Sequence, residues 1–137
     1  MQVLHEFNLL QNIFEDVFSM HFARYGLSWP KYKVLINLYM SGDYGLIQSE
    51  LSAKLLVSRA NITSLIERLE KEDLVIRRND SADKRVFRVY LSNRAVALMH
   101  AFLPIHNDFV HKAMSSLSTS EKKELIFLLK KLNTGLD

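Results

Sequence analysis

The clearest hydrophobic pattern in the chain lies between Leu46 and Leu91 and predicts two short amphipathic helices followed by two short strands. Apolar residues recur there at spacings of three and four, which indicates buried helical faces. The pattern is interrupted just before Ser58, whose hydroxyl is a suitable N-cap for a second helix that begins at Arg59. We therefore predict a helix–turn–helix whose second helix is long enough to lie in a DNA major groove. The apolar positions are Leu51, Leu55, Val57, Ile62, Leu65, Ile66 and Leu69.

The opposite side of the second predicted helix is polar, and near its N-terminus it is small and rich in hydrogen-bonding groups. Asparagine can read adenine, and serine or threonine can contact a base or a phosphate. The alternative is an ordinary solvated helix face. The candidate DNA-binding residues of this helix are Ser58, Arg59, Ala60, Asn61, Thr63, Ser64 and Arg68.

The predicted strands cover residues 74–78 and 85–91 and are joined by a polar turn. Five cations lie in this hairpin, which is typical of a wing that reaches phosphates or a minor groove. The alternative is a solvated hairpin in which these cations pair with Asp80 and Asp83. The candidate DNA-binding residues of the wing are Arg77, Arg78, Asp83, Lys84 and Arg85.

Apolar helices are predicted on both sides of this basic centre. Residues 3–25 are apolar around so much of the helix that we expect burial in a subunit interface rather than in a single core. After the wing, Ser92 can cap a long helix, which Pro104 is expected to bend or break. Ser118 and Glu121 form a potential capping box for a last helix.

The amino-acid composition excludes several classes of function. The net charge of +3 is a weak argument for nucleic acid, but nine of the 18 lysines and arginines lie between Arg59 and Arg94. The absence of cysteine excludes thiol-based sensing and disulfides. There is no apolar run of membrane-spanning length and no secretion signal, so we expect a cytoplasmic protein. No catalytic constellation is present, and the five histidines lack the spacing of a metal site. We therefore predict no enzyme, no cofactor and no metal.

Several short motifs together resemble the MarR family of transcriptional regulators. The matching runs are QSEL (48–51), SRANIT (58–63), RLEK (68–71), LVxR (74–77), DKR (83–85) and VxLS (89–92), where x is a position that does not carry the match. The chain departs from the family where Leu56 and Asp73 replace frequent glycines and where Ile47 replaces a capping serine or threonine. The resemblance implies a mostly α fold with a small β-hairpin wing. It also implies a single domain over residues 1–137, with a winged helix–turn–helix over about 30–91 and dimerisation helices over about 1–25 and 92–137.

The resemblance implies a function as well. We expect a sequence-specific regulator, a repressor, that binds a pseudo-palindromic duplex as a homodimer. The alternative is a winged-helix module that binds an acidic protein instead of DNA. Family members often lose DNA affinity on binding small aromatic or phenolic effectors between the dimer helices and the winged part. Here that place would be lined by aromatic residues, which alternatively just pack the core. They are Phe14, Phe18, Phe22, Trp29, Tyr32 and Tyr39.

Overall fold

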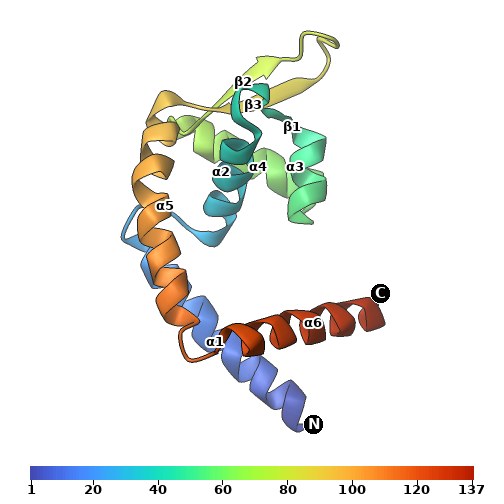
Figure 1. The fold of residues 1–137 in the computed structure, drawn as a ribbon. Helices are drawn as coiled ribbons and strands as arrows, with labels where there is room; N and C mark the ends of the chain where they lie inside the picture. The colour runs from blue at the N-terminus through green and yellow to red at the C-terminus, as the bar shows by residue number, and fades with distance from the viewer. The chain divides into compact units, whose positions relative to one another are not determined.

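The computed structural model describes all 137 residues and is mostly helical with one small antiparallel sheet (Figure 1), which confirms the predicted fold class. The chain divides into two compact units, Met1–Ala101 and Phe102–Asp137. None of the helices combines the length and hydropathy that a membrane span requires. The elements are α1 (Gln2–Ala23), α2 (Trp29–Ser41), η1 (Gly42–Tyr44), β1 (Leu46–Ile47), α3 (Gln48–Leu55), α4 (Arg59–Lys71), β2 (Val75–Asn79), β3 (Phe87–Leu91), α5 (Asn93–Ala113) and α6 (Thr119–Leu136).

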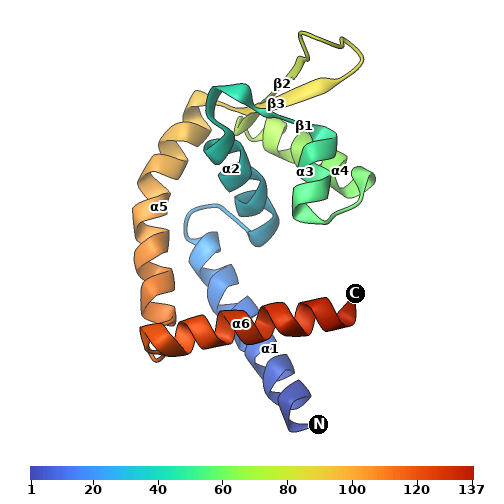
Figure 2. The ribbon, with the colours of Figure 1, turned by 45° about the vertical axis from the view of Figure 1, so that its right-hand side comes forward.

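The core of the first unit lies where α4 packs on α2, α3 and β2 (Figure 2). The predicted apolar face of α4 is fully inside, because Ile62, Ile66 and Leu69 have no exposed surface. Side chains from the other elements complete the core, and their burial fixes which face of α4 remains in solvent. They are Val34, Leu35, Leu38, Leu51, Val75 and Val89.

Serine side chains cap α2, α4 and α6, and the caps at Ser58 and Ser118 agree with the sequence prediction. Ser28 accepts the backbone N–H of Lys31 at the start of α2, and Ser58 accepts that of Asn61 at the start of α4. A complete capping box begins α6, since Ser118 and Glu121 each accept the other's backbone N–H. These caps satisfy N–H groups that have no partner within the helix.

The turn between α3 and α4 contains an unusual left-handed residue. Leu56 ends α3 at φ 54°, and its side chain is 92% exposed. Asp73, after α4, adopts a similar conformation at φ 58°. A left-handed backbone favours glycine because Cβ meets the following carbonyl oxygen. Both positions are therefore strained, and Leu56 gains no burial in return.

Leu56→Gly should raise the free energy of unfolding by about 0.5–1 kcal/mol, because it relieves the left-handed strain without losing buried surface. Thermal unfolding followed by circular dichroism should show a rise in Tm of roughly 2–4 °C. Leu55→Gly is the matched control, since Leu55 is helical and half-buried, and this change should lower Tm. A fall in Tm for Leu56→Gly would contradict the strain argument.

The sheet has the strand order β1–β3–β2, with both pairs antiparallel. Val75 pairs with Leu91, Arg77 with Val89 and Asn79 with Phe87, so the predicted hairpin is confirmed with ends shifted by one or two residues. Strand β1 was not predicted, because two residues are too few to show alternation. Gly45 precedes β1 at φ 61°, where an added Cβ would lie 2.6 Å from the carbonyl oxygen of Val89.

Pro104 does not break the helix, because α5 continues through this residue to Ala113, and a bend there stays a prediction. Proline lacks an N–H, so it removes one hydrogen bond from the helical ladder while the neighbouring turns keep theirs. The start of the helix agrees with the prediction. The hydroxyl of Ser92 accepts the N–H of Ala95 at 3.0 Å and caps it.

Candidate nucleic-acid interface

Helix α4 presents a polar face at its N-terminal end. Arg59, Ala60, Asn61 and Ser64 are exposed there, in the first two turns after the Ser58 cap. Arg68 extends this exposed face by one further turn. The buried residues of α4 are Ile62, Leu65, Ile66 and Leu69, so the packing of this apolar side determines which groups face solvent. This geometry suits insertion of the N-terminal half of α4 into a major groove.

Thr63 differs from the other candidate residues of α4 because its hydroxyl already has two protein partners. It donates to the carbonyl oxygen of Arg59 at 2.8 Å and accepts from the side-chain amide of Gln48 on α3. Thr63 is also half-buried. Its hydroxyl therefore holds the two helices together, and Gln48 is a contributor to this surface that was not among the predicted site residues.

At the tip of the wing, Asp83 holds Arg85 in a two-pronged ion pair. The guanidinium Nε lies 3.1 Å from Oδ1, and a terminal nitrogen lies 3.3 Å from Oδ2. Oδ1 also accepts the backbone N–H of Arg85 at 3.0 Å. Hydrogen bonding by the Arg85 side chain, followed by that of its backbone, lowers the pKa of Asp83, so this carboxylate is charged at neutral pH. The Arg85 side chain itself is 91% exposed and free to meet a nucleic acid.

A second carboxylate shapes the wing from within. Asp80 binds the side chain of Arg88 at 2.9 Å through one oxygen and accepts the N–H groups of Ala82 and Asp83 through the other. The hydrogen bond from Arg88 is the largest cause that lowers the pKa of Asp80. Arg88 also donates to the carbonyl oxygen of Tyr44 at 3.1 Å. Arg88 therefore links the wing to η1 through its hydrogen bonds to Asp80 and to the Tyr44 carbonyl.

The other wing cations have different surroundings. Arg77 makes two hydrogen bonds to Glu70, at 3.1 and 3.3 Å, and so ties β2 to α4. Arg78 lies over the ring of Tyr90 and has no carboxylate partner. Lys84 is exposed at the tip and has no ion pair either. The paired-hairpin alternative thus describes Arg88 with Asp80 and Arg85 with Asp83. Lys84 is unpaired, and the Arg85 guanidinium remains exposed to solvent despite its ion pair.

The C-terminal end of α4 is fixed to two other helices. Lys31 of α2 forms an ion pair with Glu72 at 2.7 Å, and Arg94 of α5 donates to the carbonyl oxygen of Glu72 at 2.7 Å. The hydroxyl of Ser92 donates to the carbonyl oxygen of Asp73 at 2.6 Å. These contacts anchor the strained turn after α4 and hold the helix at a set angle in its unit.

Five of the six aromatic residues predicted to line an effector pocket form one cluster between α1 and α2. The ring of Trp29 lies 5.4 Å from that of Phe18 and 4.9 Å from that of Phe22. Phe14 stacks on Phe18 at 4.0 Å, and Tyr32 lies 5.1 Å from Phe22. Phe18 and Phe22 are buried and act as core, whereas Phe14, Trp29 and Tyr32 are half-buried at the edge of the cluster. Tyr39 lies elsewhere, with its hydroxyl 3.2 Å from Nδ1 of His100.

Comparison with known proteins decides the family. The family model described as "MarR family" matches residues 27–87, which include α2, the helix–turn–helix and most of the wing. The transcriptional repressor YetL of Bacillus subtilis is 33% identical over 113 residues, 82% of this chain and 68% of its own length. The chain belongs to the MarR family. Its members are transcriptional regulators, which confirms the prediction that the chain is not an enzyme.

Other relatives agree with this assignment. The transcriptional repressor MprA of Escherichia coli K12 is 31% identical over 112 residues, 82% of this chain and 64% of MprA. The chain thus spans about two thirds of the length of these relatives. The S. aureus MepR–DNA complex superimposes with a TM-score of 0.86, covering 96% of each chain at 21% identity. This likeness supports the winged-helix fold.

Proposed function

We propose that this MarR-family chain is a sequence-specific DNA-binding transcriptional regulator that acts as a repressor. The observation that carries the proposal is the exposed N-terminal face of α4 in the same unit as a wing whose exposed Arg85 is held by Asp83. The first surface offers groups that can read base edges, and the second offers a guanidinium suited to a minor groove. Repression is proposed because YetL and MprA are named as repressors.

The alternative function is a protein-interaction module whose wing binds an acidic partner. Salt dependence separates the two functions. A DNA-binding wing neutralises phosphates and releases counterions, so the affinity for a fluorescent duplex should fall steeply between about 50 and 200 mM salt. Fluorescence anisotropy measures this directly. No binding of any duplex at low salt would favour the alternative.

The proposed regulator is a homodimer, because each unit exposes more apolar surface than a soluble monomer usually does. In α1 the exposed apolar residues are Val3, Leu4, Phe7, Leu9, Leu10, Ile13, Val17 and Met20. In α6 they are Leu125, Ile126, Phe127, Leu128, Leu129, Leu132 and Leu136. A second copy would cover such faces, and a two-fold dimer would present two α4 helices to a pseudo-palindromic duplex.

We expect the isolated protein to sediment as a dimer at micromolar concentration. Phe127→Glu on α6 should shift it towards monomer, because a charge buried in an apolar interface is unfavourable. Lys123→Glu is the matched control, since it adds an acidic residue to the same helix at an exposed position that is already polar. Sedimentation equilibrium distinguishes the outcomes. A well-folded monomer in the unsubstituted protein would contradict the dimer.

An effector completes the proposal. A small aromatic or phenolic anion that prefers a DNA-incompetent dimer would release DNA, and DNA would weaken its binding by the same factor. The aromatic cluster of α1 and α2 supports this part, since Trp29 and Tyr32 are half-buried at its edge. Titration of such compounds with and without duplex tests this linkage.

A further inference from the structure

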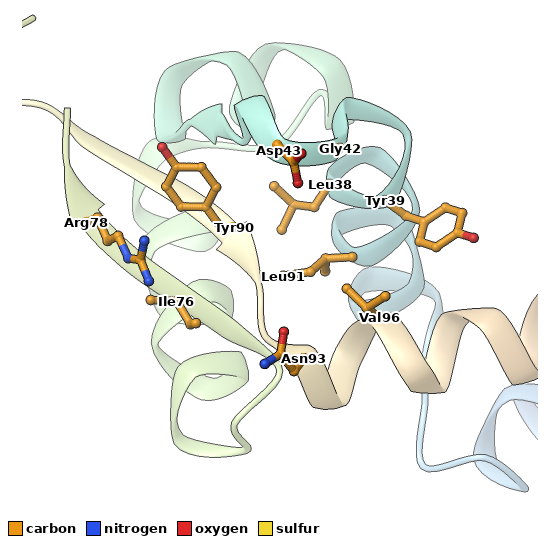
Figure 3. Close-up of a pocket in the computed structure, with 10 residues that line it drawn as sticks. All are labelled: Leu38, Tyr39, Gly42, Asp43, Ile76, Arg78, Tyr90, Leu91, Asn93 and Val96. Carbon is orange, nitrogen blue, oxygen red and sulfur yellow. The ribbon is translucent and has the colours of Figure 1, made fainter. Parts of the chain in front are cut away.

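A cavity of about 620 Å³, open to solvent, lies in the first unit on the sheet face that points away from α4 (Figure 3). Its size is within the range of small-molecule sites in proteins. Elements α2, η1, β2, β3 and the start of α5 contribute its walls. It is separate from the aromatic cluster of α1 and α2 and from the exposed face of α4. The lining residues are Leu38, Tyr39, Gly42, Asp43, Ile76, Arg78, Tyr90, Leu91, Asn93 and Val96.

Arg78 is the cation of this cavity, and the alternation of β2 places it there. Successive side chains of a strand point to opposite faces. Arg77 points to α4, where it binds Glu70, so Arg78 points to the opposite face. Figure 3 shows Arg78 beside Ile76 and Tyr90 on the strand side of the cavity. The cavity is therefore on the side of the sheet that the helix–turn–helix does not use.

The charge of Arg78 is unbalanced within the protein. The sheet register places Arg78 directly opposite Arg88, and like charges in such a pair repel. Arg88 is neutralised by Asp80, whereas the guanidinium of Arg78 has only the ring of Tyr90. An anion bound at Arg78 would balance this remaining positive charge and accept hydrogen bonds from guanidinium N–H groups that have no acceptor in the protein.

The other residues that line the cavity indicate the chemistry of the part of the ligand that does not contact Arg78. Leu38, Leu91 and Val96 form an apolar wall, which favours a hydrophobic body. Asn93 lines the same cavity and can donate a hydrogen bond to an anion. Asp43 of η1 also lines it, which disfavours a second negative charge and favours a hydroxyl or N–H there.

We propose that this cavity binds an apolar monocarboxylate, with its carboxylate on Arg78 and a hydrogen-bond donor at its other end facing Asp43. The juxtaposition of an unpaired guanidinium, an apolar wall and a carboxylate in one cavity carries the proposal. The site assigns Arg78 to a small molecule rather than to DNA, and it does not depend on the proposed regulator function.

Three related compounds test each feature by isothermal titration calorimetry without DNA. 3-(4-Hydroxyphenyl)propionate should bind, and its neutral amide should bind about tenfold more weakly or worse, because the charge-assisted hydrogen bonds to Arg78 are lost. 3-Phenylpropionate lacks the hydroxyl and should bind several-fold more weakly than the first compound. Equal affinities of acid and amide, or no binding of any of the three at millimolar concentration, would overturn the proposal.

Variants locate the site. Arg78→Gln should weaken carboxylate binding about tenfold or more, and Val96→Trp should abolish it by filling the cavity. Lys84→Gln removes another unpaired wing cation that does not line the cavity, so it should leave carboxylate binding unchanged. If Arg78→Gln weakened duplex binding but not carboxylate binding, Arg78 would be a DNA contact and the proposal would be wrong.

Discussion

Asn61→Ala should weaken binding to the cognate duplex by about 1–3 kcal/mol and binding to random DNA much less. The reason is that the Asn61 side chain is exposed on the first turns of α4, where a recognition helix meets base edges, while its backbone N–H is held by Ser58. Loss of a side-chain amide that reads a base removes discrimination but little of the electrostatic attraction. Anisotropy titrations with cognate and scrambled duplexes measure both affinities.

Asn107→Ala is the matched control, because Asn107 is exposed on α5, outside the helix–turn–helix and the wing. This variant should bind both duplexes like the unsubstituted protein. Circular dichroism and sedimentation establish that both variants are folded and assembled alike. Equal losses of affinity for the two duplexes in Asn61→Ala would show that Asn61 contacts the backbone rather than a base.

Arg85→Ala should weaken binding to every duplex and reduce the salt dependence by about one phosphate per subunit. The Arg85 guanidinium is 91% exposed at the wing tip and is aimed by Asp83. Arginine in a minor groove responds to groove width and charge more than to base identity. The measurement is the slope of log affinity against log salt for cognate and scrambled duplexes.

The substitution Asp83→Asn distinguishes two possible effects of Asp83 on DNA binding: its negative charge and its orientation of the Arg85 side chain. The substitution removes a negative charge from the wing, so simple electrostatics predicts tighter DNA binding. It also weakens the ion pair that orients the Arg85 side chain, so a positioning role of Asp83 predicts weaker DNA binding. We expect weaker binding at every salt concentration. Unchanged affinities for both Arg85→Ala and Asp83→Asn, in folded dimeric protein, would show that the wing does not contact DNA.

The sequence predicted the helix–turn–helix closely because local rules define it. The N-cap at Ser58 and the spacing of Ile62, Leu65, Ile66 and Leu69 set both the start of α4 and its buried face. The capping box at Ser118 is equally local. The left-handed turn at Leu56 agrees with the family resemblance, which places a frequent glycine there.

The features that the sequence could not predict depend on tertiary contacts. Arg77 and Arg78 are adjacent and chemically identical, yet one binds Glu70 and the other faces a cavity. The roles of Thr63 and Gln48 likewise depend on how α3 meets α4. Tyr39 was grouped with five other aromatic residues by type alone, and α2 directs it to His100 instead.

Selection of bound duplexes from a random library tests the central claim most directly. Two α4 helices related by a two-fold axis should enrich a pseudo-palindrome whose half-sites lie about one helical turn apart. The same selection with Asn61→Ala should give a weaker base preference at one or more positions in each half-site. Enrichment of no sequence over the starting library, by folded protein that binds duplex at low salt, would contradict sequence-specific recognition by α4.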